Sequence, residues 1–130
     1  MLDTEKFTVQ DHIKVGGTYD RRVFDTKTER TFIADLKTGK LTHLATKTPA
    51  QVAVYAAGVH YDLDGEREEH GAERGLGLLI HLPWTEKPEE AVCDVRWLDL
   101  RVGRKAITEA MRVERFRKLT IAQTMPHVKD

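Results

Sequence analysis

The chain has 130 residues, of which 40% are hydrophobic and 32% are charged. This length suits one compact domain and leaves no room for two, and the apolar content excludes a disordered chain. Lysine and arginine together number 21, as do aspartate and glutamate, so the formal net charge is zero. The field of the whole molecule therefore does not attract nucleic acid, and any such binding has to use a local patch.

Cys93 is the only cysteine of the chain, which excludes an internal disulfide. One cysteine alone also cannot hold a structural zinc ion or an iron–sulfur cluster, so we expect neither. The chain begins without an apolar signal region, and no apolar run approaches the ~18 residues of a membrane span. We therefore expect a cytoplasmic protein that has no membrane partner.

The first third of the chain predicts three strands joined by short links. From Phe7 to Val15 apolar and polar residues alternate with period two, which predicts one half-buried strand with Phe7 and Val9 on its apolar face. A second strand is expected at Thr18–Asp25 and a third at Thr31–Lys37, on either side of a polar turn. The short links favour an antiparallel meander.

An alanine-rich segment follows these strands and predicts a helix. It runs from Pro49 to about His60, with proline near its start and Thr48 as the expected N-cap. The next stretch, from Asp62 to Gly75, is charged and punctuated by glycine, so we expect a loop there.

The remainder predicts two strands and a second helix. The strands are expected at Leu76–Leu82 and Ala91–Leu100, and the helix runs from Gly103 to about Leu119 with one buried side that includes Ala106, Ala110 and Val113. We expect residues 1–119 to form the domain core and residues 120–130 to form a flexible tail. The order of the elements predicts an α/β fold with a mixed sheet.

The third predicted strand ends in an acid and a lysine. In an extended strand Asp35 and Lys37 project to the same face, roughly 7 Å apart. Asp20 lies on the preceding strand, which should pair with this one across the polar turn. Two carboxylates at one place repel unless a cation lies between them, and oxygen ligands suit Mg²⁺ or Mn²⁺. Lys37 could then orient an attacking water or neutralise developing charge, as phosphodiester hydrolysis requires.

The alanine-rich helix carries two polar-tipped side chains on one face. Gln51 and Tyr55 are four residues apart, so they lie one above the other on the helix. Their polar ends could reach back over the end of the third strand.

Three short motifs resemble those of one enzyme family. They are GTYDR at residues 17–21, IADLKTG at residues 33–39 and QVAVY at residues 51–55. Their order and spacing are similar to the RecB-like branch of the PD-(D/E)XK nuclease superfamily, which includes CRISPR-associated adaptation nucleases and phage exonucleases. The resemblance is close from Val15 to Tyr55 and looser beyond. It implies a restriction-endonuclease-like fold, in which a mixed central sheet is flanked by helices.

The resemblance also implies roles for six residues. Asp20, Asp35 and the carbonyl of Leu36 would bind Mg²⁺ or Mn²⁺, the two acids and Lys37 would be catalytic, and Gln51 and Tyr55 would contact the substrate. The implied activity is metal-dependent hydrolysis of DNA, by an exonuclease of recombination, repair or phage replication. For a phage-encoded protein the expected compartment is the host cytoplasm.

The sequence departs from that family at its N-terminus. Members usually carry an N-terminal helical segment with an acid or a histidine that completes the metal site, whereas this sequence begins at the first predicted strand. We therefore expect a further segment, a partner or a homo-oligomer to complete the site. The alternative function is a non-catalytic DNA-binding or assembly module that keeps the nuclease fold.

The last predicted helix is rich in basic residues. Its cationic side chains could track DNA phosphates, or they could form an ordinary solvated face. They are Arg104, Lys105, Arg112, Arg115, Arg117 and Lys118.

Overall fold

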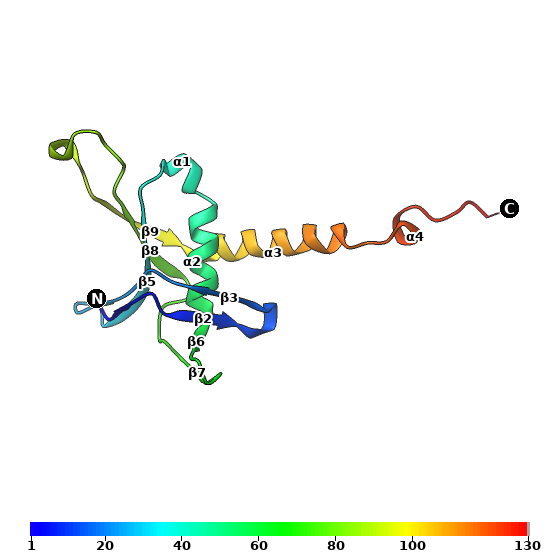
Figure 1. The fold of residues 1–130 in the computed structure, drawn as a ribbon, viewed down its shortest axis with the longest axis horizontal. Helices are drawn as coiled ribbons and strands as arrows, with labels where there is room; N and C mark the ends of the chain where they lie inside the picture. The colour runs from blue at the N-terminus through cyan, green and yellow to red at the C-terminus, as the bar shows by residue number, and fades with distance from the viewer. Residues whose placement is uncertain (130) are drawn as a thin grey trace.

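The structure, a computed structural model, describes residues 1–129 without the side chain of His12. In this part of the chain, two β-sheets and four α-helices form an α/β fold, as predicted, and one long helix extends away from the body (Figure 1). No helix in residues 1–129 is long and apolar enough to cross a membrane.

The main sheet has five strands and is mixed. Its two central strands, β5 and β8, are parallel, whereas every other neighbouring pair is antiparallel. The sheet therefore needs one crossover connection between β5 and β8 and can use short links elsewhere. In spatial order the strands are β1 (Asp3–Thr4), β4 (Arg21–Asp25), β5 (Arg30–Lys37), β8 (Leu76–His81) and β9 (Asp94–Asp99).

Helix α2 (Lys47–Ala57) lies within the crossover and packs on the main sheet. It begins two residues before the predicted start at Pro49, after the short helix α1 (Leu41–Leu44). Its N-cap is Thr46 rather than Thr48, and Thr46 makes no side-chain capping bond. The core between α2 and the sheet consists of Tyr19, Ile33, Val52, Ala53, Ala56, Leu79, Leu98 and Leu100.

The prediction of one strand from Phe7 to Val15 is wrong. The chain forms β2 (Phe7–Gln10), turns at residues 11–13 through a 3₁₀ helix, and returns as β3 (Val15–Thr18). Lys14 has a φ of 56°, in the left-handed region that such a tight reversal uses. The face assignment was also reversed, because Thr8 is buried and its hydroxyl donates to the Gly17 carbonyl (3.3 Å), whereas Phe7 is exposed.

Strands β2 and β3 belong to a second sheet rather than to a meander with β4 and β5. Its order is β3-β2-β6-β7, where β6 (Val59–Tyr61) and β7 (Arg67–Glu68) come from the predicted end of the helix and the predicted loop. Strands β6 and β7 follow the C-terminal end of α2, and β6 pairs with β2 from the start of the chain (Figure 1).

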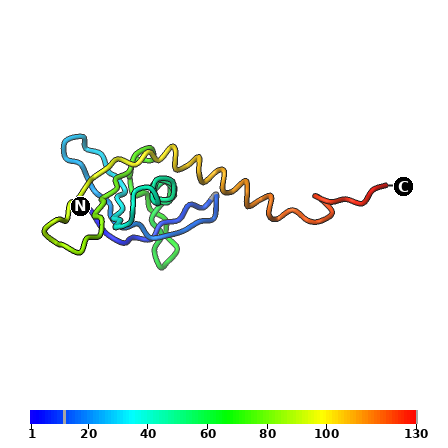
Figure 2. Tube along the Cα trace, turned by 90° about the horizontal axis from the view of Figure 1, so that it is seen from above, coloured from blue at the N-terminus to red at the C-terminus, as the bar shows by residue number. Residues whose placement is uncertain are grey.

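Helix α3 (Leu100–Arg117) begins directly after β9, three residues before the predicted start at Gly103. Asp99 caps it by accepting a hydrogen bond from the Arg101 amide (3.0 Å). Its first turns pack against α2, and the rest extends beyond the body (Figures 1 and 2). The predicted buried side is therefore wrong, since only Leu100 and Gly103 of this helix are buried. Beyond α3, residues of the predicted tail form the short helix α4 (Ile121–Thr124).

Candidate functional site

Asp35 and Lys37 lie together near the C-terminal end of β5, in the middle of the main sheet. The ammonium of Lys37 lies 3.0 Å from Asp35 Oδ2. Asp35 is only 3% exposed, whereas the side chain of Lys37 is 30% exposed. The pair is therefore a half-buried ion pair; Arg22–Asp3 is another, and the remaining ion pairs among residues 1–129 lie at the surface.

Asp20 joins the pair from the segment just before β4. Arg21 is paired with Ala34 in the register of β4 and β5, which places Asp20 beside Asp35. The Leu36 amide donates a hydrogen bond to Asp20 Oδ2 (3.0 Å), so the Asp20 carboxylate faces this strand end. The two acids and Lys37 thus come together in one place.

The Asp35 carboxyl is destabilised as an anion by its surroundings. Burial raises its pKa above the usual value, the neighbouring Lys37 ammonium lowers it, and the Asp20 carboxylate raises it again. The net direction is upward. Within residues 1–129, the Lys37 ammonium at 3.0 Å is the one partner of the buried Oδ2 atom, and it is held there by charge. A buried carboxylate beside a second acid is costly, and a bound cation would lower that cost.

The backbone of Leu36 points toward the same place. Its N–H is directed at Asp20, and the N–H and C=O of one residue in a strand project to the same side. The next carbonyl, that of Lys37, points the other way and accepts from the Leu82 amide (2.9 Å). The Leu36 carbonyl therefore faces the space just before the first residue of β4, beside Asp20.

These groups fit a hard divalent cation. Asp20, Asp35 and the Leu36 carbonyl supply oxygen atoms only, which is the ligand type of Mg²⁺ and Mn²⁺. In residues 1–129, no cluster of three or more histidine, cysteine, aspartate or glutamate side chains is arranged to hold a metal ion. The remaining ligands would therefore have to be water, substrate or another segment.

Gln51 and Tyr55 form a second group, on α2. The Gln51 amide nitrogen donates to the Tyr55 hydroxyl (3.0 Å), as their four-residue spacing allows. The Tyr55 ring covers Gly17 so closely that a Cβ there would lie 2.7 Å from Cε1, which explains the glycine of the first motif. Among the described residues, neither side chain hydrogen-bonds to Asp20, Asp35 or Lys37, so their predicted role as substrate contacts stays a prediction.

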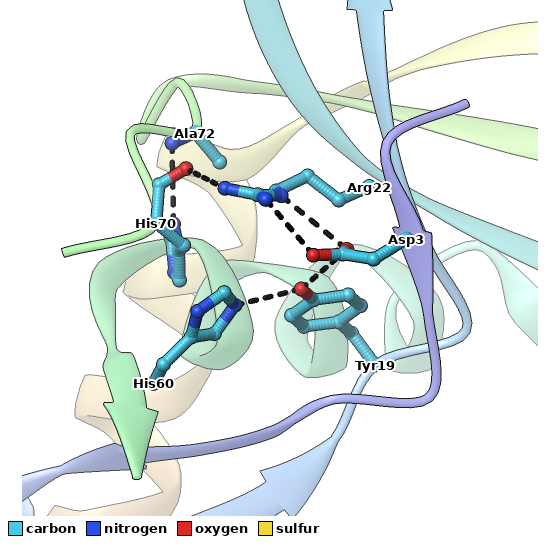
Figure 3. A network of polar contacts seen from close by, with 6 residues as sticks. All are labelled: Asp3, Tyr19, Arg22, His60, His70 and Ala72. Carbon is cyan, nitrogen blue, oxygen red and sulfur yellow. Dashed lines mark hydrogen bonds and ion pairs between the residues drawn. The ribbon is translucent and has the colours of Figure 1, made fainter. Parts of the chain in front are cut away.

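A network of polar side chains surrounds the Tyr19 hydroxyl, away from Asp35 and Lys37, and was not predicted from the sequence (Figure 3). The buried Tyr19 hydroxyl donates to Asp3 Oδ1 (2.7 Å). The Tyr19 oxygen also lies 2.7 Å from His60 Nε2, and because the hydroxyl hydrogen points to Asp3, this second hydrogen bond needs the hydrogen on His60 Nε2. Arg22 bridges Asp3 Oδ2 (2.9 Å) and the His70 carbonyl (2.7 Å). Burial first, and then the hydrogen bond to Asp3, raise the pKa of Tyr19. This phenol therefore stays protonated.

The network borders a cavity of about 770 Å³, a volume typical of ligand pockets. Its lining contains His60 and the cations Lys6 and Arg22, and also the acids Asp3, Asp62, Glu66, Glu68 and Glu69. A cavity with more acids than cations repels phosphate, so we do not assign DNA to it. Little in the sequence predicts this network, because His60 and His70 lie ten residues apart in a segment without periodicity.

His70 fastens the 62–75 segment to α2 with one ring nitrogen and holds the backbone of that segment with the other. Nδ1 accepts from the Ala72 amide (3.1 Å), which leaves the hydrogen on Nε2 to donate to the Tyr55 carbonyl (2.9 Å). Burial lowers the pKa of His70 below its ordinary value of 6.5. The folded protein therefore holds His70 neutral.

This arrangement predicts an acid-sensitive stability. As pH falls below about 6.5, His70 is protonated in the unfolded chain but stays neutral in the folded protein. The free energy of unfolding therefore falls toward lower pH. In urea denaturation at pH 7.5 and 5.5, His70→Gln should show a smaller difference in unfolding free energy than the wild type. The exposed His43 offers the control, because His43→Gln should leave the wild-type difference unchanged. An equal pH dependence in all three proteins would contradict this account of His70.

No protein-family model matches the chain, and no curated protein matches it.

Proposed function

We propose that this chain is the core of a metal-dependent DNA nuclease, similar to the RecB-like branch of the PD-(D/E)XK superfamily, that acts in the cytoplasm. One observation carries the proposal: Asp20 and the buried Asp35 meet beside Lys37 at one strand end, where burial and the second acid raise the pKa of Asp35. Structural ion pairs have no need for a second acid at the same point, whereas a cation site does.

The arrangement of the elements supports the same proposal. The three motifs lie on neighbouring elements: the segment before β4, the end of β5, and α2, which packs on the sheet. The mixed sheet is of the kind that the resemblance implies. Strand ends beside loops are also where sites are commonly built on a rigid scaffold.

The residues of the chain divide the chemistry among them. A bound Mg²⁺ or Mn²⁺ would supply stabilisation of charge on a phosphoryl oxygen. Asp20 and Asp35 would hold that ion, and Lys37 would keep Asp35 ionised and present a partly exposed cation to the scissile phosphate. DNA hydrolysis needs these three tasks at one place.

Metal binding is the direct test. Titration with Mn²⁺ in a calorimeter should give weak binding to the wild type and none to Asp35→Asn, which removes a ligand charge. Asp64→Asn is the matched control, because Asp64 is an exposed acid in the acidic 62–73 segment. It should bind as the wild type does. Equal heats for the wild type and Asp35→Asn would place any metal elsewhere, and loss in Asp64→Asn alone would place it in that acidic segment.

A second function, a non-catalytic DNA-binding or assembly module, is favoured by a separate observation. No third acid or histidine joins Asp20 and Asp35 among residues 1–129. A protein that shifts duplex DNA in a gel but cuts none with Mg²⁺ or Mn²⁺ would support this module and not the enzyme.

A further inference from the structure

Helix α3 is the longest helix among the described residues, and most of its side chains are exposed. Its first part packs across α2 and lies beside the β2–β3 hairpin, and the rest extends beyond both sheets (Figures 1 and 2). Every residue after Ile107 in this helix is exposed. Its surface is therefore open to a partner along two or more turns.

The charges of α3 gather on one face of the helix. With 3.6 residues per turn, positions 101, 104, 105, 112 and 115 fall within one third of the circumference. All five are cations: Arg101, Arg104, Lys105, Arg112 and Arg115. The two acids of the helix, Glu109 and Glu114, lie outside this face. We call these five residues the basic face.

The basic face creates a local field on a neutral protein. Residues 100–117 contain six cations and two acids, a net charge of +4. Residues 62–73 contain six acids and one cation, a net charge of −5, and they lie in a different part of the molecule (Figure 1). The zero total charge thus conceals two regions of opposite sign, and the positive region is on α3.

The cations of the basic face are free to exchange partners. Arg101 pairs with Asp99 (3.4 Å) and Arg112 with Glu109 (3.1 Å), both at exposed positions where such pairs contribute little. Within residues 1–129, Arg104, Lys105 and Arg115 form no ion pair. An anionic ligand would therefore meet three unpaired cations and displace only two weak pairs.

We infer that the basic face of α3 binds the phosphate backbone of duplex DNA. From residue 101 to residue 115 the face runs for about 21 Å, or roughly six base-pair steps. Four of its five cations are arginines, whose planar guanidinium groups bind phosphate with two hydrogen bonds. The inference rests on the proposed function for the choice of DNA as the ligand.

An anionic membrane is the competing partner for a basic helix with exposed apolar residues. Val113 (53% exposed) and Phe116 (73%) are such residues. However, the apolar positions Ile107, Ala110 and Met111 line a groove with Ile13 and Val15 of the body. Beyond that groove Val113 lies in one row with Glu109 and Arg117, so the free end of α3 offers only a short apolar surface to a membrane.

The test measures binding of a fluorescein-labelled 20-base-pair duplex in EDTA, where no metal-dependent cleavage occurs. Arg104→Gln/Arg115→Gln removes two cations of the basic face, and the control Arg117→Gln/Lys118→Gln removes two cations outside it. Glutamine keeps the helix propensity, and circular dichroism checks the fold. Anisotropy titrations at 50 to 200 mM salt give the slope of log affinity against log salt.

The first variant should bind more weakly and lose about 2 units of that slope, roughly 0.9 for each phosphate contact. The control should keep the wild-type slope. Equal losses in both variants, no binding by the wild type, or stronger binding to phosphatidylserine vesicles than to DNA would overturn the inference. Binding through the basic face without any cleavage would remove the proposed nuclease function and leave this inference standing.

Discussion

Replacing Lys37 with alanine is expected to slow Mn²⁺-dependent DNA hydrolysis by about 10²–10³-fold, the usual cost of removing one transition-state charge stabiliser. The reason is its position. Lys37 Nζ lies 3.0 Å from Asp35 Oδ2, and its side chain is exposed enough to touch a phosphate as well. The loss should appear in the rate at saturating DNA rather than in DNA affinity, because the basic face of α3 is unchanged.

The position of Lys37 also predicts an effect on stability. Because Lys37 is the cation beside the buried Asp35 carboxylate, Lys37→Ala should also raise the pKa of Asp35 further and alter stability. Thermal unfolding therefore has to accompany the kinetics. Lys27→Ala is the control, since Lys27 is an exposed lysine in the turn between β4 and β5. Full activity in Lys37→Ala would refute its catalytic role.

The parts of the fold that the sequence predicted well are those with a strong local pattern. The apolar runs of β5 and β8, and the alanine-rich α2, are each right to within a few residues. The N-terminal hairpin was missed because the alternation of apolar and polar residues continues through residues 11–13, although the chain reverses its direction there. Periodicity cannot register a reversal that leaves the apolar spacing intact.

The candidate site divides in the same way. Asp20, Asp35 and Lys37 were predicted to meet because a hairpin fixes the register of two neighbouring strands, and a register is a local property. The network of Tyr19, His60 and Asp3 depends on strands from two sheets that no short pattern relates. Its members are single residues, each unremarked in its own segment. Only the tertiary fold brings them together.

The exposed part of α3 has a simple geometric cause. Helix α3 crosses α2 at a large angle and does not run along it (Figures 1 and 2). The two helices touch at Gly103 and Pro49, near the start of each, so the 18 residues of α3 soon pass beyond the 11-residue α2. The helical periodicity of Ala106, Ala110 and Val113 was real, but a pattern cannot tell how far the neighbouring surface extends.

The contact at Gly103 makes the last prediction, a loss of stability on Gly103→Ala. A Cβ at residue 103 would lie 2.1 Å from the Pro49 carbonyl oxygen, 2.4 Å from its carbon and 2.9 Å from the Ala50 nitrogen. All three atoms belong to backbone, so no side-chain rotation can relieve the overlap, and α3 has to move away from α2. Overpacking of this kind typically costs about 1–3 kcal/mol.

The opposing effect is known and smaller. Alanine is better than glycine inside a helix by about 1 kcal/mol, so an open site at residue 103 would give a gain instead. Urea denaturation should show a lower midpoint for Gly103→Ala at an unchanged slope. Gly75→Ala is the matched control, because nothing lies within 4 Å of a Cβ there, and it should unfold as the wild type does. A gain in stability on Gly103→Ala would mean that α2 and α3 do not pack at this close distance, and the path of α3 away from the body would then need another cause.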